Sequence, residues 1–385
     1  MHRSKQAGII TIISITPLLM PLMAAPAVAG DALEIKMPVQ AYADVGAFKR
    51  REGADTTTTS TTTPGRDGAF VGTLTLFVSP QLGDHIRGLF EAVSEFNEAG
   101  MHEIAVERAQ IGYAYNDALT VWGGRFHTPY GYWNTAYPHG GAQLQPSIAR
   151  PVQLSGSLPE HTIGLWVTGL FNMGVGKLTY DAYVGNASRV VDGAIDPNHS
   201  AGDNQSKNFG GNIGYNAGGP LGGLRVGVHA LRAKVTVCGA VTDTGNCKTP
   251  VSGKSDLNIH GAYAHYENHN LELFAEYYRF KNTNLISSFY PGYKARSSSG
   301  FVQLGYALAE DWMPYIRYEE TGYDQNDEYF KNLSNGRSYG INTLGVRYEL
   351  HSNAVLKAEF SQIKSRTAST LNDSKEMRVQ YAIRF

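Results

Sequence analysis

The carboxyl-terminal segment from Glu376 to Phe385 constrains the fold more than any other part of the chain. Polar and apolar residues alternate through it, and it ends on an aromatic residue. Successive side chains of an extended strand point to opposite faces, so Met377 and Val379 share one face while Arg378 and Gln380 share the other. A strand of about ten residues with one apolar and one polar face has the length and pattern needed to cross a membrane within a closed barrel.

The amino terminus predicts export. A short positive region precedes an apolar run from Ala7 to Met23, and a small-residue A-x-A sequence follows at Ala27 to Ala29. This order is typical of a cleaved signal peptide, so we expect a signal over residues 1–29 and one domain over residues 30–385. A retained membrane anchor is the alternative, which the prolines inside the apolar run disfavour.

Composition excludes several classes of protein. The chain has 33 basic and 34 acidic residues, and this balance argues against nucleic acid as a partner. No cofactor-binding motif occurs. The two cysteines, Cys238 and Cys247, are predicted to form a disulfide bond in an oxidising, exported setting, and without a nearby histidine pattern they are weak evidence for a metal site.

The alternating pattern recurs along most of the chain. About sixteen such strands are expected, from Val39 to Ala47 at the start to Lys375 to Phe385 at the end. Tight turns rich in Asn, Asp, Gly and Pro alternate with long polar loops. The threonine-rich segment Thr56 to Thr63 lies in the first of these long loops. We therefore predict an all-β, antiparallel transmembrane barrel, with short turns and both termini on the periplasmic side and long loops outside.

The longest connection, Thr128 to His161, is dense in proline, glycine and aromatic residues, which favours a packed loop over a disordered one. It follows the segment Gly124 to Gly131, which reads GRFHTPYG. This segment and the terminal strand resemble the sixteen-stranded porins of the Gram-negative outer membrane, including their phosphate-selective branch. The resemblance implies that the third external loop folds into the lumen and narrows it. It also implies a homotrimer surrounded by outer-membrane lipid and lipopolysaccharide.

Candidate pore-lining residues come from the inward faces of the early strands and from the long loop. They are Arg87, Glu91, Glu103, Glu107, Arg125, His127, Tyr130, Trp133, Glu160 and His161. Acidic side chains on one wall and basic ones on the other would produce a transverse field across the narrowest point. Cross-strand ion pairs in a polar interior are the alternative. Arg125 and His127 are favoured because they end the strand from which the loop departs.

The predicted function is passive diffusion of small hydrophilic solutes and ions through the barrel. One alternative is a substrate-specific channel for anions, phosphate or small organic acids, with the loop aromatics forming a sliding surface instead of packing on the wall. Another is an outer-membrane enzyme, but no nucleophile-elbow or zinc-helix motif is present, so we expect no enzyme. Small residues such as Gly112 and Ala114 are expected on the outer face, where a neighbouring subunit could pack.

Overall fold

The computed structural model describes most of the chain beyond the amino-terminal region. The described residues are 35–52, 66–96, 102–151, 156–196, 207–242, 247–248, 251–268, 270–288, 290–334, 336–366 and 373–385. The predicted signal peptide and the threonine-rich segment lie outside the described residues. The predicted export and the start of the mature domain therefore stay predictions.

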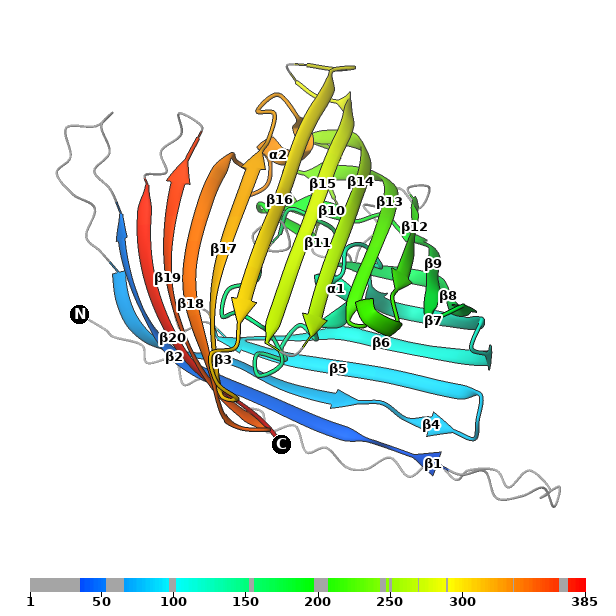
Figure 1. The fold of residues 1–385 in the computed structure, drawn as a ribbon. Coiled ribbons are helices and arrows are strands. Elements are labelled where there is room, and N and C mark those ends of the chain that lie inside the picture. Colours follow the sequence, from blue (N-terminus) through cyan, green and yellow to red (C-terminus); the bar gives the residue numbers. More distant parts are fainter. Residues whose placement is uncertain are drawn as a thin grey trace, which may run out of the picture. The chain divides into compact units, whose positions relative to one another are not determined.

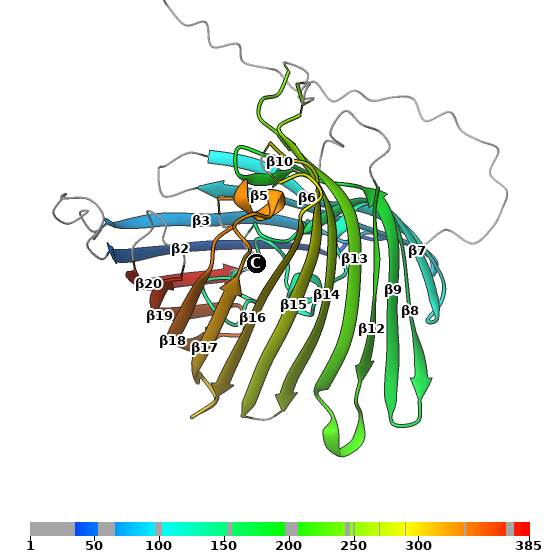
Figure 2. The same ribbon diagram turned by 90° about the horizontal axis from the view of Figure 1, so that it is seen from above.

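Sixteen long strands form one closed antiparallel barrel (Figures 1 and 2). Each strand pairs with its neighbours in chain order, and the first pairs with the last along Tyr42–Glu52 and Ser374–Arg384, which closes the sheet. This arrangement confirms the predicted fold class and strand number. The strands are β2 (Val39–Glu52), β3 (Arg66–Val78), β5 (Ile86–Phe96), β6 (His102–Asn116), β7 (Leu119–His127), β8 (His161–Met173), β9 (Gly176–Asn186), β12 (Lys207–Asn216), β13 (Leu224–Cys238), β14 (Gly253–Asn268), β15 (Leu271–Ile286), β16 (Lys294–Tyr306), β17 (Trp312–Gly322), β18 (Tyr339–His351), β19 (Ala354–Ser365) and β20 (Ser374–Arg384).

Short elements complete the described chain. They are the strands β1 (Ile35–Lys36), β4 (Gln81–Leu82), β10 (Arg189–Val191) and β11 (Ala194–Asp196), the helices α1 (Trp133–Ala136) and α2 (Glu328–Lys331), and the 3₁₀ turn η2 (Gly219–Leu221). No helix among the described residues is both long enough and apolar enough to cross a membrane.

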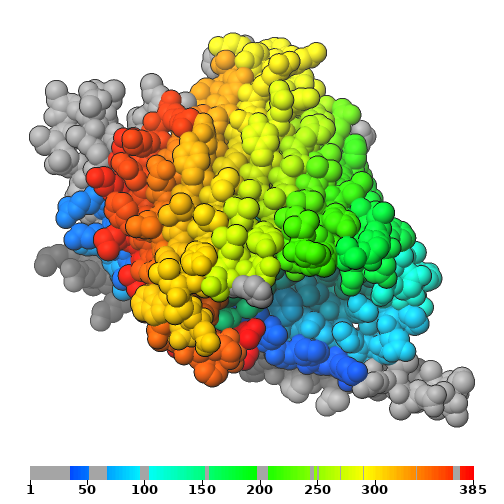
Figure 3. Space-filling model, in the orientation of Figure 1, coloured from blue at the N-terminus to red at the C-terminus, as the bar shows by residue number. Residues whose placement is uncertain are grey.

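The two faces of the barrel wall differ as the alternation predicts. In β20, Met377 and Val379 are 55% and 41% exposed on the outer face, whereas Gln380 is 6% exposed on the inner face. The same alternation places exposed leucine, isoleucine, valine and tyrosine side chains along the outside of the other strands. The outer wall is continuous over the strands coloured green to red (Figure 3). An apolar outer surface of this extent is stable only in an apolar surrounding.

The expectation that Gly112 and Ala114 lie on the outer face is wrong. Both are buried, whereas their neighbours Ile111 and Tyr113 are 69% and 42% exposed. The register is fixed by these larger apolar side chains, so the small residues face inward. A Cβ atom at Gly112 would lie 2.5 Å from the Trp122 ring, which explains the glycine. These two residues therefore give no support to a subunit contact.

Short and long connections lie at opposite ends of the barrel, here called the short-turn end and the long-loop end. At the short-turn end, β6 and β7 are joined by two residues, and the carboxyl-terminal Phe385 donates its backbone N–H to Ala41 O at 2.8 Å. The long-loop end carries a small additional hairpin of β10 and β11, whose first strand runs parallel to the end of β13. Assignment of these ends to the two sides of a membrane stays a prediction.

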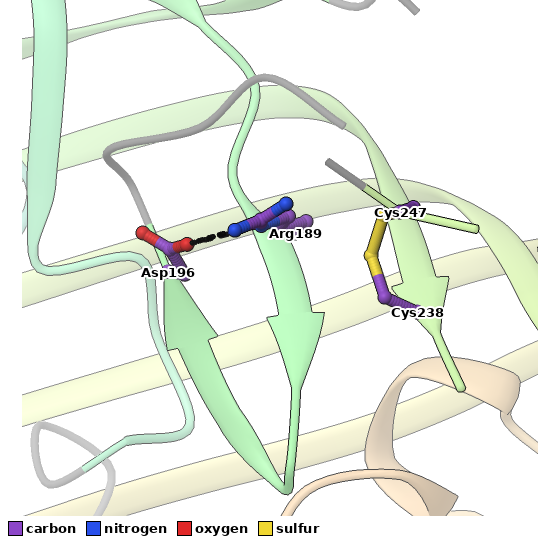
Figure 4. The surroundings of a disulfide bond; sticks show 4 residues. All are labelled: Arg189, Asp196, Cys238 and Cys247. Atoms are coloured by element: carbon purple, nitrogen blue, oxygen red, sulfur yellow. Dashed lines mark hydrogen bonds and ion pairs between the residues drawn. A yellow bond between two sulfur atoms is a disulfide. The ribbon is translucent and has the colours of Figure 1, made fainter. Parts of the chain in front are cut away.

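The predicted disulfide bond is confirmed at the long-loop end. Cys238, the last residue of β13, is bonded to Cys247, and their Cα atoms are 5.2 Å apart. The bond lies near the additional hairpin, which the Arg189–Asp196 ion pair closes at 2.8 Å (Figure 4). The disulfide and the hairpin therefore brace the same corner of the barrel mouth.

Candidate functional site

The chain between β7 and β8, residues 128–160, is held together where it leaves and rejoins the wall. We call it the inner loop; its residues 152–155 lie outside the described residues. Thr128 donates its backbone N–H to Glu160 O at 2.8 Å, and the Asn134 side-chain amide donates to the carbonyl oxygens of Thr128 and Glu160 at 2.9 and 3.1 Å. These bonds join the two ends of the inner loop where it leaves and rejoins the wall.

The inner loop reaches the far wall of the barrel first through residues 131–133. The backbone N–H groups of Tyr132 and Trp133 both donate to Glu276 Oε1 on β15, at 2.8 and 2.7 Å. Gly131 has a φ of +61°, and a Cβ atom there would lie 2.3 Å from the Tyr278 hydroxyl. Glycine is therefore required both by the backbone conformation and by the close approach to β15.

Aromatic side chains fill the space between this part of the inner loop and β14–β16. Trp133 is completely buried and packs edge-on against Phe274, with ring centroids 5.5 Å apart. Tyr130 is 2% exposed, and Tyr132 stacks on His265 with centroids 4.3 Å apart. Burial raises the pKa of Tyr132, so its hydroxyl stays protonated at neutral pH. Tyr130 and Trp133 thus pack against the wall, and neither offers a surface to a passing solute.

Charged side chains of the late strands hold the second half of the inner loop by its backbone. Lys357 is completely buried and donates to the carbonyl oxygens of Ala142 and Ser147 at 2.5 and 3.3 Å. Glu359 accepts the N–H of Ile148 at 2.8 Å. The guanidinium groups of two further residues, Arg317 and Arg347, donate to other carbonyl oxygens of the same stretch.

The contacts place the inner loop inside the barrel. It departs from β7, yet it contacts β15 and also β17, β18 and β19, which lie across the closed sheet from β7. Only a segment that crosses the lumen can contact inward side chains of all these strands. The inner loop therefore occupies part of the lumen.

An ionic cluster joins the inner loop to the near wall. Glu107 on β6 lies 3.2 Å from His139 Nδ1 of the loop, 2.8 Å from His161 Nε2 on β8 and 3.7 Å from the Arg125 guanidinium on β7. His127 packs edge-on against His161 and its Nδ1 lies 2.9 Å from Asn134 O. Burial lowers the pKa of His139 to about 3, so its ring is neutral at neutral pH.

An arginine-rich cavity lies between the inner loop and the wall formed by β2 and β17–β20. Its volume is about 490 Å³, and two carboxylates, Glu319 and Glu376, are among its lining residues. Five guanidinium groups also line it: Arg50, Arg150, Arg317, Arg337 and Arg378. The side chains of Arg317 and Arg378 are 1% and 31% exposed, so the charges of the cavity are only partly open to water. The excess of positive side chains makes this space favourable for anions.

The structure brings some of the sequence-predicted residues together and leaves others apart. Glu107, Arg125, His127 and His161 form the near-wall cluster. Glu91 pairs with Arg108 at 2.6 Å. Glu91 and Glu107 thus both form ion pairs with an arginine of a neighbouring strand, as the alternative interpretation expected.

The other predicted residues lie elsewhere. Glu160 pairs with Arg150 at 3.1 Å where the inner loop ends. Arg87 is exposed beside the short turn that precedes β5, away from the inner loop. Glu103 pairs through its backbone with Glu95, and its side chain lies outside the described residues. Whether any of these residues lines a conducting path stays a prediction.

Sequence reasoning missed the late-strand half of the site. Lys357 and Glu359 lie on the polar side of the alternation in β19, but nothing in their local sequence distinguishes them from other inward charges. The five cavity arginines come from β2, the inner loop and three late strands or loops, so no short stretch of sequence contains enough of them to predict the cavity. Counting inward-facing charges strand by strand around the closed barrel would have found them.

Known structures share this fold. No protein-family model and no curated protein sequence matches the chain. Among solved structures, an anion-selective porin from Comamonas acidovorans is 15% identical and superposes with a TM-score of 0.60, covering 91% of this chain and 100% of its own. The outer membrane channel DcaP of Acinetobacter baumannii, at 12% identity, has a TM-score of 0.58 over 91% of this chain and 97% of its own. OmpF of Salmonella typhi, at 14% identity, has a TM-score of 0.55 over 91% of this chain and 97% of its own. At these identities the likeness concerns the fold alone, and the chain therefore has a porin-like fold.

Proposed function

We propose that this protein is an outer-membrane channel of a Gram-negative bacterium through which small hydrophilic solutes and ions diffuse passively, with a preference for anions. The observation that carries the anion preference is the cavity beside the inner loop, where five arginines and two glutamates meet. Fixed charge in a partly desolvated passage acts strongly on a passing ion, since the local dielectric constant is lower than in bulk water.

Two further observations support a channel. The exposed apolar side chains on the outer face suit a lipid surrounding, and the inner face is polar. The porin-like fold is shared with a protein described as an anion-selective porin and with one described as an outer membrane channel. A trimer, contact with lipopolysaccharide, and any specific solute such as phosphate or an organic acid remain part of the proposal.

The test is single-channel recording of the purified, folded protein in planar bilayers, with the reversal potential measured under a potassium chloride gradient. We expect stepwise openings and a reversal potential of the sign that chloride permeation gives. The triple variant R50Q/R337Q/R378Q should shift the reversal potential toward potassium and keep the openings. Arg279→Gln is the matched control, since it removes a guanidinium from the exposed outer face of β15.

The outcomes separate the parts of the proposal. A reversal potential of the sign that potassium permeation gives, in the unmodified protein, would contradict the anion preference. The proposal that the protein is a channel would still stand. Absence of any conductance from protein whose folding is verified by heat-modifiable gel mobility would contradict the channel itself.

A further inference from the structure

The near-wall cluster contains two imidazoles and a carboxylate whose ring nitrogens and oxygen converge. Glu107 comes from β6, His139 from the inner loop and His161 from β8. One ligand atom of each, the carboxylate oxygen and one ring nitrogen apiece, lies within 4.8 Å of the others. Three parts of the chain that are far apart in sequence therefore present their metal-binding atoms to one point.

Two of the three spacings between these atoms match those of ligands around a transition-metal ion. Oε2 of Glu107 lies 3.2 Å from His139 Nδ1 and 2.8 Å from His161 Nε2. Ligands about 2.0–2.1 Å from a zinc ion lie about 2.9 Å apart at right angles and about 3.3 Å apart at tetrahedral angles. Imidazole nitrogen with carboxylate oxygen is also a donor set that suits zinc, nickel and copper and the facial two-histidine, one-carboxylate sites.

One of the three ligand atoms lacks a well-aligned hydrogen bond. His161 is 7% exposed, and its Nε2 meets no hydrogen-bond geometry among the described residues, although it lies 2.8 Å from Glu107 Oε2. A buried ring nitrogen without a partner costs free energy unless another group satisfies it. A cation between His161 and Glu107 would bind both this nitrogen and the carboxylate oxygen.

The surroundings of the cluster are compatible with a cation. His139 Nε2 lies 3.5 Å from Glu95 Oε1. The His139 ring therefore contacts one carboxylate through Nε2, while its Nδ1 faces Glu107. A carboxylate in this position orients a metal-binding histidine. Arg125 shares the Glu107 carboxylate, since its guanidinium lies 3.7 Å from Oε2 and its Nε donates to Glu107 O at 2.9 Å.

We infer that Glu107, His139 and His161 form a binding site for a divalent transition-metal ion, which would fasten the inner loop to β6 and β8. Bound metal would join the loop to the wall at a second place, opposite the backbone contacts made by Lys357 and Glu359. The inference rests on the cluster itself and holds whether or not the barrel conducts anions.

The experiment is calorimetric titration of the purified, folded and chelator-treated protein with zinc chloride, and a parallel titration with cobalt chloride followed by visible absorption. We expect saturable binding of one ion per chain and a cobalt spectrum typical of nitrogen and oxygen ligands. His139→Ala and Glu107→Gln should each weaken zinc binding by at least about tenfold, and Glu95→Gln by a smaller factor. His260→Ala is the matched control, because His260 is exposed on the outer face, and its affinity should be unchanged.

Two results would overturn the inference. One is the lack of saturable zinc binding to the unmodified protein. The other is equal affinity in His139→Ala and the unmodified protein, with heat-modifiable mobility showing that both are folded. Conductance recorded in the presence of chelator tests the channel separately, so failure of the metal site and failure of the channel are distinguishable.

Discussion

Two connections that leave the wall at the long-loop end contain a short helix, and they are stabilised in different ways. In the inner loop, α1 follows Tyr132, which supplies no side-chain cap, and the free N–H groups at the start of the helix are bound by Glu276 of the wall. In the loop of residues 323–338, α2 is capped by its own Asp327, which accepts the N–H of Tyr329 at 3.0 Å. The first helix thus has no side-chain cap of its own, whereas the second has one, to which Asn282 and Asn284 of β15 add hydrogen bonds.

The difference extends to the rest of each loop. Charged side chains of the barrel hold the inner loop by backbone atoms, so its conformation depends on the wall more than on its own side chains. The second loop carries an acidic residue in the first turn of α2 and Lys331 in the last, which complement the helix dipole. The two loops meet where Tyr329 donates to Ser157 O at 2.9 Å. Changes in the wall should therefore undock the inner loop first.

The largest effect is expected from Lys357→Met. Removal of the ammonium group leaves the buried carbonyl oxygens of Ala142 and Ser147 without that donor, and it should destabilise the docked inner loop by about 3 kcal/mol. Unfolding in guanidinium, followed by tryptophan fluorescence, measures the change, and protease digestion of folded protein reports release of the loop. Lys177→Met, at an exposed position at the start of β9, should change stability by less than about 0.5 kcal/mol. Equal protease resistance in the two variants would show that Lys357 does not hold the loop.

An intermediate effect is expected from Gly131→Ala, compared with Gly174→Ala. Both glycines have positive φ, of +61° and +60°, but a Cβ at Gly131 would meet the Tyr278 hydroxyl and the Glu276 carboxylate, whereas nothing lies within 4 Å of one at Gly174. Backbone strain alone should cost about 1 kcal/mol at Gly174, and the additional clash should raise the loss to about 2–3 kcal/mol at Gly131. Denaturant midpoints measure both. Equal losses would mean that the inner loop adjusts without cost to its contact with β15.

The wall was predictable from the sequence, and the contents of the lumen were not. Strand positions follow from alternation over ten or more residues, and lipid-facing residues such as Met377 and Val379 repeat that signal in every strand. The contacts between Lys357 and the loop carbonyl oxygens join residues more than 200 positions apart, and they depend on the backbone path of the loop, which no side-chain pattern encodes. The alternating pattern does not predict correctly on which face small residues lie, as at Gly112 and Ala114, because their larger neighbours decide the register.

The smallest effect is expected from the pH dependence of the second loop. Burial raises the pKa of Asp327 from 3.8 to about 6, and the nearby Asp324 and Glu328 carboxylates add to the rise, while hydrogen bonds from the Tyr329 N–H and the Asn282 amide oppose it. The folded loop therefore binds the proton more tightly than the unfolded chain does. Its contribution to stability is fully present below about pH 4 and falls as the pH rises toward 6.

Hydrogen exchange of residues 324–334 between pH 4 and 7, corrected for the intrinsic rate, should show more frequent opening at the higher pH. Since only one loop opens, global unfolding should change by less than about 1 kcal/mol. Asp327→Asn keeps a side-chain acceptor at the helix cap and should remove the pH dependence, whereas Asp311→Asn, at an exposed turn, should leave it intact. A pH dependence that survives Asp327→Asn would assign the titration to another group and would show that the cap carboxyl does not control the opening of this loop.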